Sequence, residues 1–461
     1  MKNSIRCARS WQIQRLKRSF LQVRGLPFFD VLSTRVLSQF AERACGGRDR
    51  IFTPLVVLKA FLFQVLSQDG SCKHAVARVL SERLQSGQSA NSINTGPYCK
   101  ARQRLPRAPL ENAVRESGQT LHQRAPSAWG WRGHRVVLAD GTTALMPDTL
   151  DNQREFPQQG NQQPGLGFPI VRIVALISLG AGAVLDYALG PYQGKGSGES
   201  SLFSTLLHTL QPGDLLLADR YYCTYAIMAL LVHHGVQGLF QKHAQRKPHW
   251  HRGERLGAKD HLIKWAKPPR KPVWMSAQDY LKLPPTLTIR ELAVNGIVYV
   301  TTLSNPKRYP RRALAEHYRS RWTIELDLRS IKTDMAMERL RCKSPERVRK
   351  EIAAHLLAYN LVRANLNRAA QCFEKIPRQL SFKSALQLLN NAASQLLLLS
   401  GKALQAFATA LLQAMALSPI GRQKRLPQPR AVKRRPKPYP LLTRPRHAAC
   451  QAIRRPTNSL R

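Results

Sequence analysis

Two aspartates each close a strongly apolar run. Residues 135–140 read Arg-Val-Val-Leu-Ala-Asp and residues 214–219 read Asp-Leu-Leu-Leu-Ala-Asp, so two predicted strands end on Asp140 and Asp219. Neighbouring parallel strands bring such ends together at the sheet edge where α/β folds keep their sites. Two carboxylates there repel each other, and a hard cation such as Mg²⁺ relieves the repulsion. The alternative is a pair of solvated turn residues, because Asp140-Gly141 is itself a turn dipeptide.

A predicted helix over Arg311–Asp334 carries a polar stripe with a third acid. At about 100° per residue, five polar side chains fall within about 80° of one another. They are Tyr318, Arg321, Glu325, Arg329 and Lys332. The alternative is a salt-bridge ladder, since Arg321 and Glu325 are four residues apart.

Apolar residues border this stripe on both sides, which favours a face turned into the protein. Ile324, Leu328 and Ile331 form one flank, and Trp322 and Leu326 form the other. The other acids of this helix, Glu316, Asp327 and Asp334, fall on the opposite face. We therefore expect Asp327→Asn to be nearly silent.

The spacing Tyr318-x2-Arg321-x3-Glu325-x6-Lys332 resembles the Tyr–Arg–Glu–Lys signature of bacterial transposases of the insertion-sequence-four family. Further blocks are similar to that family and extend the resemblance over about residues 90–365. They are Asp140-Gly-Thr-Thr-Ala-Leu-Met-Pro-Asp148-Thr, Leu217-Ala-Asp219-Arg-Tyr-Tyr, Leu340-Arg-Cys-Lys-Ser-Pro-Glu-Arg-Val-Arg-Lys-Glu-Ile and Leu357-Ala-Tyr-Asn-Leu361.

The resemblance implies a DNA transposase that cuts and transfers the ends of its own insertion sequence. Asp140, Asp219 and Glu325 would be the catalytic triad and would hold two Mg²⁺ ions, for which Mn²⁺ can substitute. Tyr318, Arg321 and Lys332, joined by Arg329, would contact the DNA. The implied partners are the terminal inverted repeats, target DNA and a second copy of the chain.

Two other functions remain open at this stage. A catalytically silent DNA-binding protein derived from a transposase would keep the basic surface. A metal-dependent nuclease would use the same carboxylates without strand transfer. Joined DNA products distinguish the transposase from the nuclease.

The predicted fold class is α/β. The resemblance implies a ribonuclease-H-like (retroviral-integrase-like) mixed-sheet core, with a β-rich insertion between the second and third acids. We expect six segments: a helical DNA-binding region over 1–125, the first part of the core over 126–241, the insertion over 242–308, core helices over 309–370, C-terminal helices over 371–418 and a basic, Pro-rich, disordered tail over 419–461.

Charge supports a polyanionic partner. The chain of 461 residues has 72 Lys and Arg against 27 Asp and Glu, a net charge of +45, which favours nucleic acid. The eight cysteines lack zinc-ligand spacing and fit reduced thiols. No secretory signal is visible, so we expect a cytoplasmic, nucleoid-associated bacterial protein. The uncharged stretch 403–420 is expected to be a packed helix, because Gln405, Thr409 and Gln413 form a polar stripe.

Three other kinds of site are less favoured by the sequence: a base-stacking tryptophan, a zinc site and a nucleotide-binding loop. Trp250, Trp265 and Trp274 of the insertion are each more typical of packing than of stacking on a base. A zinc site among His243, His249, His251 and His261 is less favoured than a basic solvated face. Lys195 and Glu199 border a Gly-rich stretch without the phosphate-loop ending, so nucleotide binding is not expected.

Overall fold

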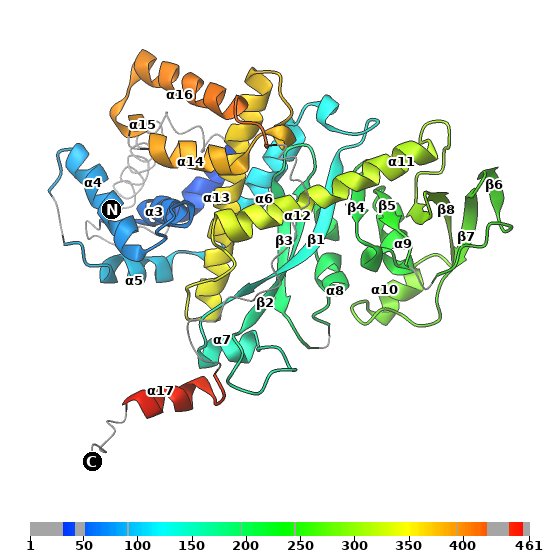
Figure 1. The fold of residues 1–461 in the computed structure, drawn as a ribbon, viewed down its shortest axis with the longest axis horizontal. Helices are drawn as coiled ribbons and strands as arrows, with labels where there is room; N and C mark the ends of the chain where they lie inside the picture. The colour runs from blue at the N-terminus through cyan, green and yellow to red at the C-terminus, as the bar shows by residue number, and fades with distance from the viewer. Residues whose placement is uncertain are drawn as a thin grey trace, which may run out of the picture.

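The computed structural model describes residues 31–41, 51–89, 92–194, 196–243, 246–393, 395–421 and 442–454 (Figure 1). The first 30 residues of the helical region expected over 1–125 lie outside these residues. So do Lys195 and most of the tail expected over 419–461.

A nine-stranded mixed sheet forms the centre of the molecule, which confirms the predicted α/β class. Its order is β3-β2-β1-β4-β5-β9-β8-β7-β6. Strand β1 pairs antiparallel with β2 and parallel with β4, and β4 pairs parallel with β5. The first five strands are β1 (Val136–Leu145), β2 (Ile170–Ser178), β3 (Val184–Pro191), β4 (Leu215–Ala218) and β5 (Gln237–Gln241).

Residues 242–308, the expected insertion, extend this same sheet. Strand β9 pairs antiparallel with β5, and the order continues through β8 and β7 to β6. The elements are β6 (Glu254–Gly257), β7 (Asp260–Ala266), α10 (Ala277–Lys282), β8 (Thr286–Val294) and β9 (Ile297–Thr301). Two buried ion pairs hold the strands together: Arg290 to Asp260 at 2.6 Å and Lys242 to Glu291 at 2.5 Å.

Alternating residues of β1 face two separate hydrophobic layers. Val136 and Leu138 belong to the cluster formed with α6, α12 and α13, whereas Val137 and Ala139 belong to the cluster formed with α8 and α9. The period of two that defines a strand produces this alternation. The covering helices are α6 (Arg107–Arg124), α8 (Glu199–Ser204), α9 (Tyr225–His233), α12 (Thr323–Arg329) and α13 (Pro345–Cys372).

Helix α13 is the buried axis of the helical part. It contacts α3, α6, α14 and α16, and Figure 1 shows these helices gathered around it. Its Asn360 accepts a hydrogen bond from the Val184 amide and donates one to the Val184 carbonyl, both at 2.8 Å. A Cβ at Gly118 would lie 2.0 Å from that carbonyl oxygen, so α6 can pack closely on β3 only with glycine there. The helices before the sheet are α2 (Thr34–Ala41), α3 (Pro54–Leu66), α4 (Cys72–Gln85) and α5 (Gly96–Arg104).

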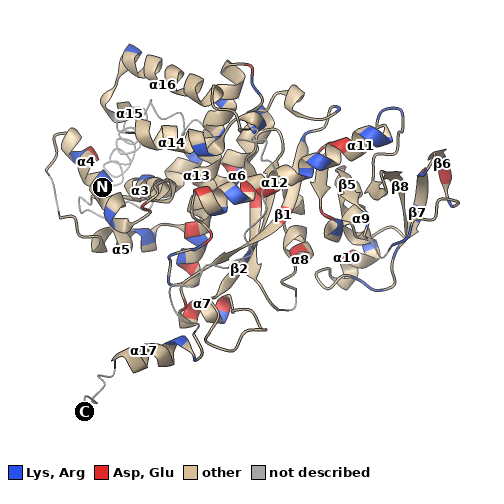
Figure 2. Ribbon diagram, viewed as in Figure 1, with Lys and Arg blue, Asp and Glu red and all other residues tan. Residues whose placement is uncertain are grey.

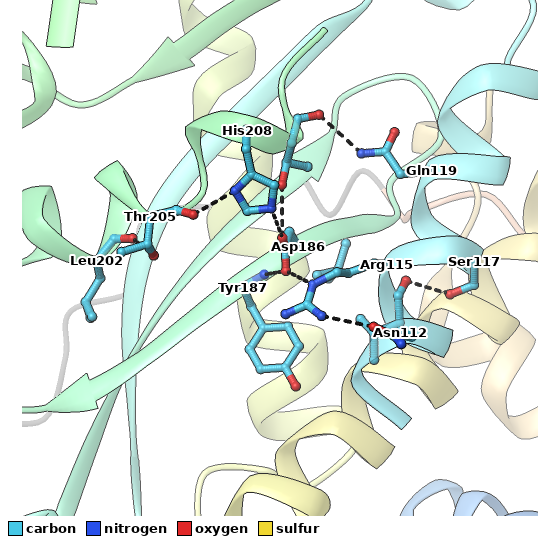
Figure 3. A network of polar contacts seen from close by, with 12 residues as sticks. Asn112, Arg115, Ser117, Gln119, Asp186, Tyr187, Leu202, Thr205 and His208 are labelled. Atoms are coloured by element: carbon cyan, nitrogen blue, oxygen red, sulfur yellow. Dashed lines mark hydrogen bonds and ion pairs between the residues drawn. The ribbon is translucent and has the colours of Figure 1, made fainter. Parts of the chain in front are cut away.

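The buried carboxylate of Asp186 ties three segments together (Figure 3). It accepts hydrogen bonds from Arg115 of α6 at 2.8 Å and from the Thr209 hydroxyl at 2.9 Å. His208 lies 3.5 Å away in the same turn. This network fixes the segment after α8 against both β3 and α6.

The C-terminal helices are α14 (Phe382–Ala392), α15 (Gln395–Leu398), α16 (Gly401–Ala416) and α17 (Arg446–Arg454), and α7 (Leu150–Glu155) follows β1. Gln405, Thr409 and Gln413 are exposed on α16, as their spacing predicted. In the described part of the chain no helix has both the length and the apolarity needed to cross a membrane. The six cysteines among the described residues are all free thiols.

Candidate active site

Asp140 lies inside a strand rather than at its end, which corrects the sequence prediction. Strand β1 continues to Leu145, and Asp140 pairs with Ala175 of β2. The parallel pairing with β4 does stop here, because its last pair is Ala139 with Ala218. Asp140 and Asp219 are therefore the first residues beyond that pairing on two adjacent strands. The turn alternative for Asp140-Gly141 is wrong, since β2 holds both residues in an extended strand.

The Asp140 carboxyl group is difficult to ionise at this position. Burial raises its pKa to about 6, and the carboxylates of Glu199 and Glu325 act in the same direction. The Gly141 amide, which donates to Oδ1 at 2.8 Å, and the Arg321 guanidinium oppose the shift. Several negative groups therefore converge on the end of the β1–β4 pairing.

The predicted helix over Arg311–Asp334 consists of four consecutive helical segments, of which two are α-helical, one is 3₁₀ and one is π. They are α11 (Arg311–Tyr318), a 3₁₀ turn (Arg319–Trp322), α12 and a π turn (Ser330–Asp334). A 3₁₀ turn has three residues per turn, so it rotates the following residues away from the face that a continuous α-helix gives them. Trp322 and Leu326 are accordingly 58% and 52% exposed, and the prediction that they form a buried flank is wrong. The opposite flank, Ile324, Leu328 and Ile331, is buried as predicted.

Arg321 joins two of the three predicted acids. Its guanidinium nitrogens lie 3.9 Å from Asp140 Oδ2 and 3.9 Å from Glu325 Oε1. The side chain is buried and stacks on Trp322, with 4.5 Å between the guanidinium carbon and the ring centre. The Glu325 side chain is half exposed. Glu325 thus lies on the solvent-exposed side of the site, and the buried Arg321 lies between it and Asp140.

Tyr318 fastens the same helical segment to the sheet. Its hydroxyl donates a hydrogen bond of 3.1 Å to the carbonyl oxygen of Ala218, the residue before Asp219. Burial raises the pKa of Tyr318 to about 12. The structure brings Tyr318, Arg321 and Glu325 to the two aspartates from one helical segment. Figure 2 shows the acidic positions of β1, α8 and α12 in this part of the molecule.

The remaining two members of the polar stripe stand apart. Arg329 is exposed and Lys332 is partly exposed, and neither side chain forms an ion pair or hydrogen bond within the described residues. Their predicted contacts with DNA stay predictions.

Asp327 is not the silent surface acid that the sequence predicted. Its side chain is fully buried and accepts hydrogen bonds from Arg363 at 2.7 Å, Arg378 at 2.5 Å and Tyr359 at 2.9 Å. Arg378 also donates to the carbonyl of Leu179 just after β2. The face opposite Glu325 is thus packed against other helices, and Asp327 fixes α12 there.

The donor set fits a hard divalent cation in its chemistry. Asp140, Asp219 and Glu325 offer carboxylate oxygens, which Mg²⁺ prefers. Arg321 lies between Asp140 and Glu325, and across the described ranges no three acidic, imidazole or thiol groups lie close enough to share one ion. A cation held by all three acids therefore requires the exposed Glu325 side chain to turn toward the aspartates.

The three tryptophans considered for base stacking take part in packing within the region 242–308. Trp265 donates to Glu291 at 3.0 Å and lies under Arg246, Trp250 contacts the His261 ring, and Trp274 packs against buried residues. The zinc alternative gains no support, since no metal-binding group is found among the described histidines.

A basic pocket of about 230 Å³ opens beside the helical part. Arg102, on α5, is partly buried in it and donates to the Cys342 sulfur at 3.3 Å. Most charged residues of the lining are cations: Arg102, Arg341, Lys343, Arg347 and Lys350, with Glu351 as the acid. Such a surface suits a phosphate.

One acid of the site was missed from the sequence. Glu199, the first residue of α8, lies against Gly141, although the sequence placed it only beside a Gly-rich stretch. Gly141 itself is the signal, because a strand position without a side chain often marks a close approach.

Residues 131–361, half of the chain, match a family model described as a transposase DDE domain. The transposase InsG for insertion sequence element IS4 of Escherichia coli strain K12 is 27% identical over 348 residues, which cover 74% of this chain and 77% of that protein. A cryo-EM structure of a piggyBac transposase synaptic complex with hairpin DNA aligns with a TM-score of 0.42 at 8% identity, over 86% of this chain and 85% of the other.

Proposed function

This chain belongs to the transposase DDE domain family, and on that premise we propose that it cuts and transfers the ends of its own insertion sequence through Asp140, Asp219 and Glu325. One observation carries the assignment to these residues. Asp140 and Asp219 leave the β1–β4 pairing together, and Arg321 links Asp140 to Glu325.

Divalent metal ions, two in our proposal and Mg²⁺ by preference, would be held by these three carboxylates. When bound, they supply an activated water or DNA 3′-hydroxyl and stabilise the departing 3′-oxygen. The chain's own residues do the positioning. Arg321 offers a planar fork able to bind a phosphate from the protein side, and Tyr318 holds the segment with Glu325 at the strand that ends before Asp219.

The fold proposed for residues 126–241 and 309–370 is a ribonuclease-H-like core. The mixed order β3-β2-β1-β4-β5, with one candidate acid in β1 and another directly after the neighbouring strand β4, supports it. We propose residues 242–308 as an insertion because its strands extend one edge of that sheet and lie between the second and third acids. The remaining expected boundaries are proposed unchanged.

DNA is the proposed partner, as the ends of the element and as the target. The net charge of +45 and the basic pocket beside α5 support it. Two ends must be joined in one reaction, so we propose that two copies of the chain act on them together. The proposed location is the bacterial cytoplasm, where the DNA lies.

A cell-based excision and insertion assay tests this function. A marker flanked by the terminal repeats beside the gene is followed with the wild-type chain, with Glu325→Gln and with the control Glu316→Gln. The control removes an exposed acid of the same helical segment, two residues before Tyr318 and nine before Glu325. We expect the wild type and the control to move the marker and Glu325→Gln to fail. Free cut ends without insertions would indicate the nuclease, and end binding without cutting would indicate the silent DNA-binding protein.

A further inference from the structure

We propose that Cys72 and Cys99 form an oxidant-sensitive thiol pair in the basic pocket beside α5, and that hydrogen peroxide converts this pair into a disulfide. Cys72 is the thiol that reacts first, and Cys99 is the thiol that completes the disulfide. None of the three candidate acids lines this pocket, so the inference goes beyond the proposed function and does not depend on it.

The pocket gathers three of the six free thiols found in the described part of the chain. Cys72, Cys99 and Cys342 all line it. Cys72 is the first residue of α4, Cys99 lies on α5 and Cys342 lies just before α13, so three segments far apart in the sequence bring the thiols together (Figure 1). Across the described ranges no three acidic, imidazole or thiol groups lie close enough to hold one ion, so these thiols do not form a metal cluster there.

Two side-chain donors point at the sulfur of Cys72. Nη1 of Arg102 and Nε2 of Gln64 each lie 3.6 Å from this sulfur. Cys72 also begins a 14-residue helix whose N-cap is Ser71, so the positive end of the helix dipole lies at the same place. A cation and a helix N-terminus both stabilise the thiolate, which is the reactive form of cysteine. Cys72 is only partly buried, so a small molecule in the pocket can reach it.

The rest of the pocket adds positive charge. Arg341, Lys343 and Arg347 are exposed in its lining, and none of them forms an ion pair with another described residue. Glu351 is the acid of the lining, and its carboxylate accepts hydrogen bonds from the backbone amides of Arg341 and Cys342 at 2.9–3.0 Å. Its negative charge is therefore turned toward the backbone, and the thiols lie in the electropositive, partly exposed setting that is typical of reactive cysteines.

Cys99 is the thiol that can pair with Cys72. The two side chains form a hydrogen bond with each other, and helix α4 contacts α5. Burial and the neighbouring Cys72 raise the pKa of Cys99, so Cys99 stays protonated while Cys72 reacts. Cys342 is the poorer partner because it is buried, and burial together with the Glu351 carboxylate raises its pKa far above the ordinary value.

The oxidation proceeds in two steps. The Cys72 thiolate attacks one oxygen of hydrogen peroxide, the O–O bond breaks, and Cys72 becomes a sulfenic acid while hydroxide leaves and takes up the proton that Cys72 had released. The Cys99 sulfur then attacks the Cys72 sulfur, and the sulfenic hydroxyl leaves as water with the proton of Cys99. Two thiols and one peroxide thus give one disulfide and two waters. The disulfide joins α4 to α5 and removes the thiolate beside Arg102.

Alkylation rates test the reactivity of Cys72. The reduced full-length protein is treated at pH 7 with iodoacetamide, and modification of each cysteine is followed by mass spectrometry, with the exposed Cys372 and Cys450 as internal controls. We expect Cys72 to react about 10-fold faster than either control although it is less exposed. Arg102→Gln should remove most of this advantage, with thermal unfolding as the check on folding. Arg347→Gln, which changes an exposed side chain, should slow Cys72 by about 2-fold and leave both controls unchanged.

Peroxide treatment tests the pairing with Cys99. After exposure to hydrogen peroxide and digestion by trypsin without reductant, the wild type should yield the peptide of residues 60–73 linked to that of residues 84–100. The matched control Cys372→Ser should yield the same linked peptide, whereas Cys72→Ser and Cys99→Ser should not. Cys99→Ser should instead keep the sulfenic acid on Cys72, which dimedone traps.

Three results overturn the proposal. If Cys72 is alkylated no faster than Cys372 and Cys450, or if both charge variants react as the wild type does, the pocket does not activate this thiol. If peroxide leaves the two peptides unlinked, or links Cys72 to a cysteine other than Cys99, the two thiols are not a pair. Each of these results leaves DNA cleavage by the three acids untouched, so the proposed function stands or falls on its own assay.

Discussion

Tyr318 donates a hydrogen bond of 3.1 Å to the carbonyl oxygen of Ala218, across 100 residues of chain. Ala218 is the last residue of β4 and precedes Asp219, whereas Tyr318 ends α11, seven residues before Glu325. The contact therefore sets the distance between the segment with the third acid and the strand that ends at the second. Tyr318, for which the resemblance implies DNA contact, thus has a structural contact within the protein.

Tyr318→Phe should keep the fold and reduce DNA cutting. Loss of one buried hydrogen bond lowers the free energy of unfolding by about 1 kcal/mol and leaves the Ala218 carbonyl without its partner. Because the segment with Glu325 is then held less firmly, we expect end cleavage to slow by about 10-fold, a change of about 1.4 kcal/mol in the barrier. Cleavage rates at saturating DNA measure this effect. Unchanged cleavage with unchanged stability would show that the contact positions nothing.

Asp327→Asn should destabilise the protein strongly. The variant leaves Arg363 and Arg378 together in the interior without the carboxylate that both bind. Breaking a buried ion pair from one side lowers stability by about 3–5 kcal/mol. Chemical denaturation measures the difference, with the exposed Glu316→Gln as a control that should stay within about 0.5 kcal/mol of the wild type. A wild-type midpoint for Asp327→Asn would refute the buried network.

Stability should fall in mild acid because of His317. Its ring stacks on Trp131 at 4.4 Å, and burial lowers its pKa from 6.5 to about 4, with His134 adding to the effect. Between pH 6.5 and pH 4 the imidazole of His317 is protonated in the unfolded chain but not in the folded chain. The contribution of His317 to the free energy of unfolding is therefore complete above pH 6.5 and is lost as the pH falls toward 4. The loss amounts to at most about 3 kcal/mol.

Denaturation curves between pH 7 and pH 4.5 reveal this dependence. His317→Phe keeps an aromatic ring against Trp131 and has no group to protonate, so its stability should decline less over the same interval. Parallel pH profiles for the wild type and His317→Phe would show that the imidazole is not the group responsible.

Arg321→Lys should impair cutting although the charge is kept. The guanidinium reaches Asp140 and Glu325 at once, whereas a lysine ammonium is a single point charge and cannot bridge both in the same way. We expect at least about a 10-fold slower cleavage and little change in stability. The exposed Arg319→Lys is the matched control and should cut at the wild-type rate. Equal rates for both variants would refute a role for the fork of Arg321.

The sequence predicted those parts of the site that depend on local patterns. The two apolar runs before Asp140 and Asp219 indicated adjacent strands, and the buried flank of Ile324, Leu328 and Ile331 indicated one face of the third segment. The prediction for the other flank, Trp322 and Leu326, failed where the helix changes pitch. Regular helical spacing assumes a continuous α-helix and does not predict the 3₁₀ turn at Arg319–Trp322.

Contacts between residues far apart in the sequence could also not be predicted from local patterns. The partners of Asp327, Arg363 and Arg378, lie 36 and 51 residues later in other helices. The local sequence pattern does not contain these contacts, so it predicted a solvent-facing side chain for Asp327. Glu199 meets Gly141 through tertiary packing, and neither residue forms a motif with the other. The end of β1 was misplaced because Asp-Gly favours turns, whereas β2 holds this pair in an extended strand through its hydrogen bonds.

A comparison of cutting with binding in one purified variant tests most directly whether Glu325 acts with Asp140 and Asp219 in DNA cleavage. Full-length wild type, Glu325→Gln and Glu316→Gln are incubated with an end duplex and Mg²⁺, and nicking and complex formation are measured in the same samples. We predict that Glu325→Gln binds the duplex as the wild type does and produces no nicked DNA, while Glu316→Gln does both. Measurable nicking by Glu325→Gln in Mg²⁺ would show that Glu325 is not required for cleavage.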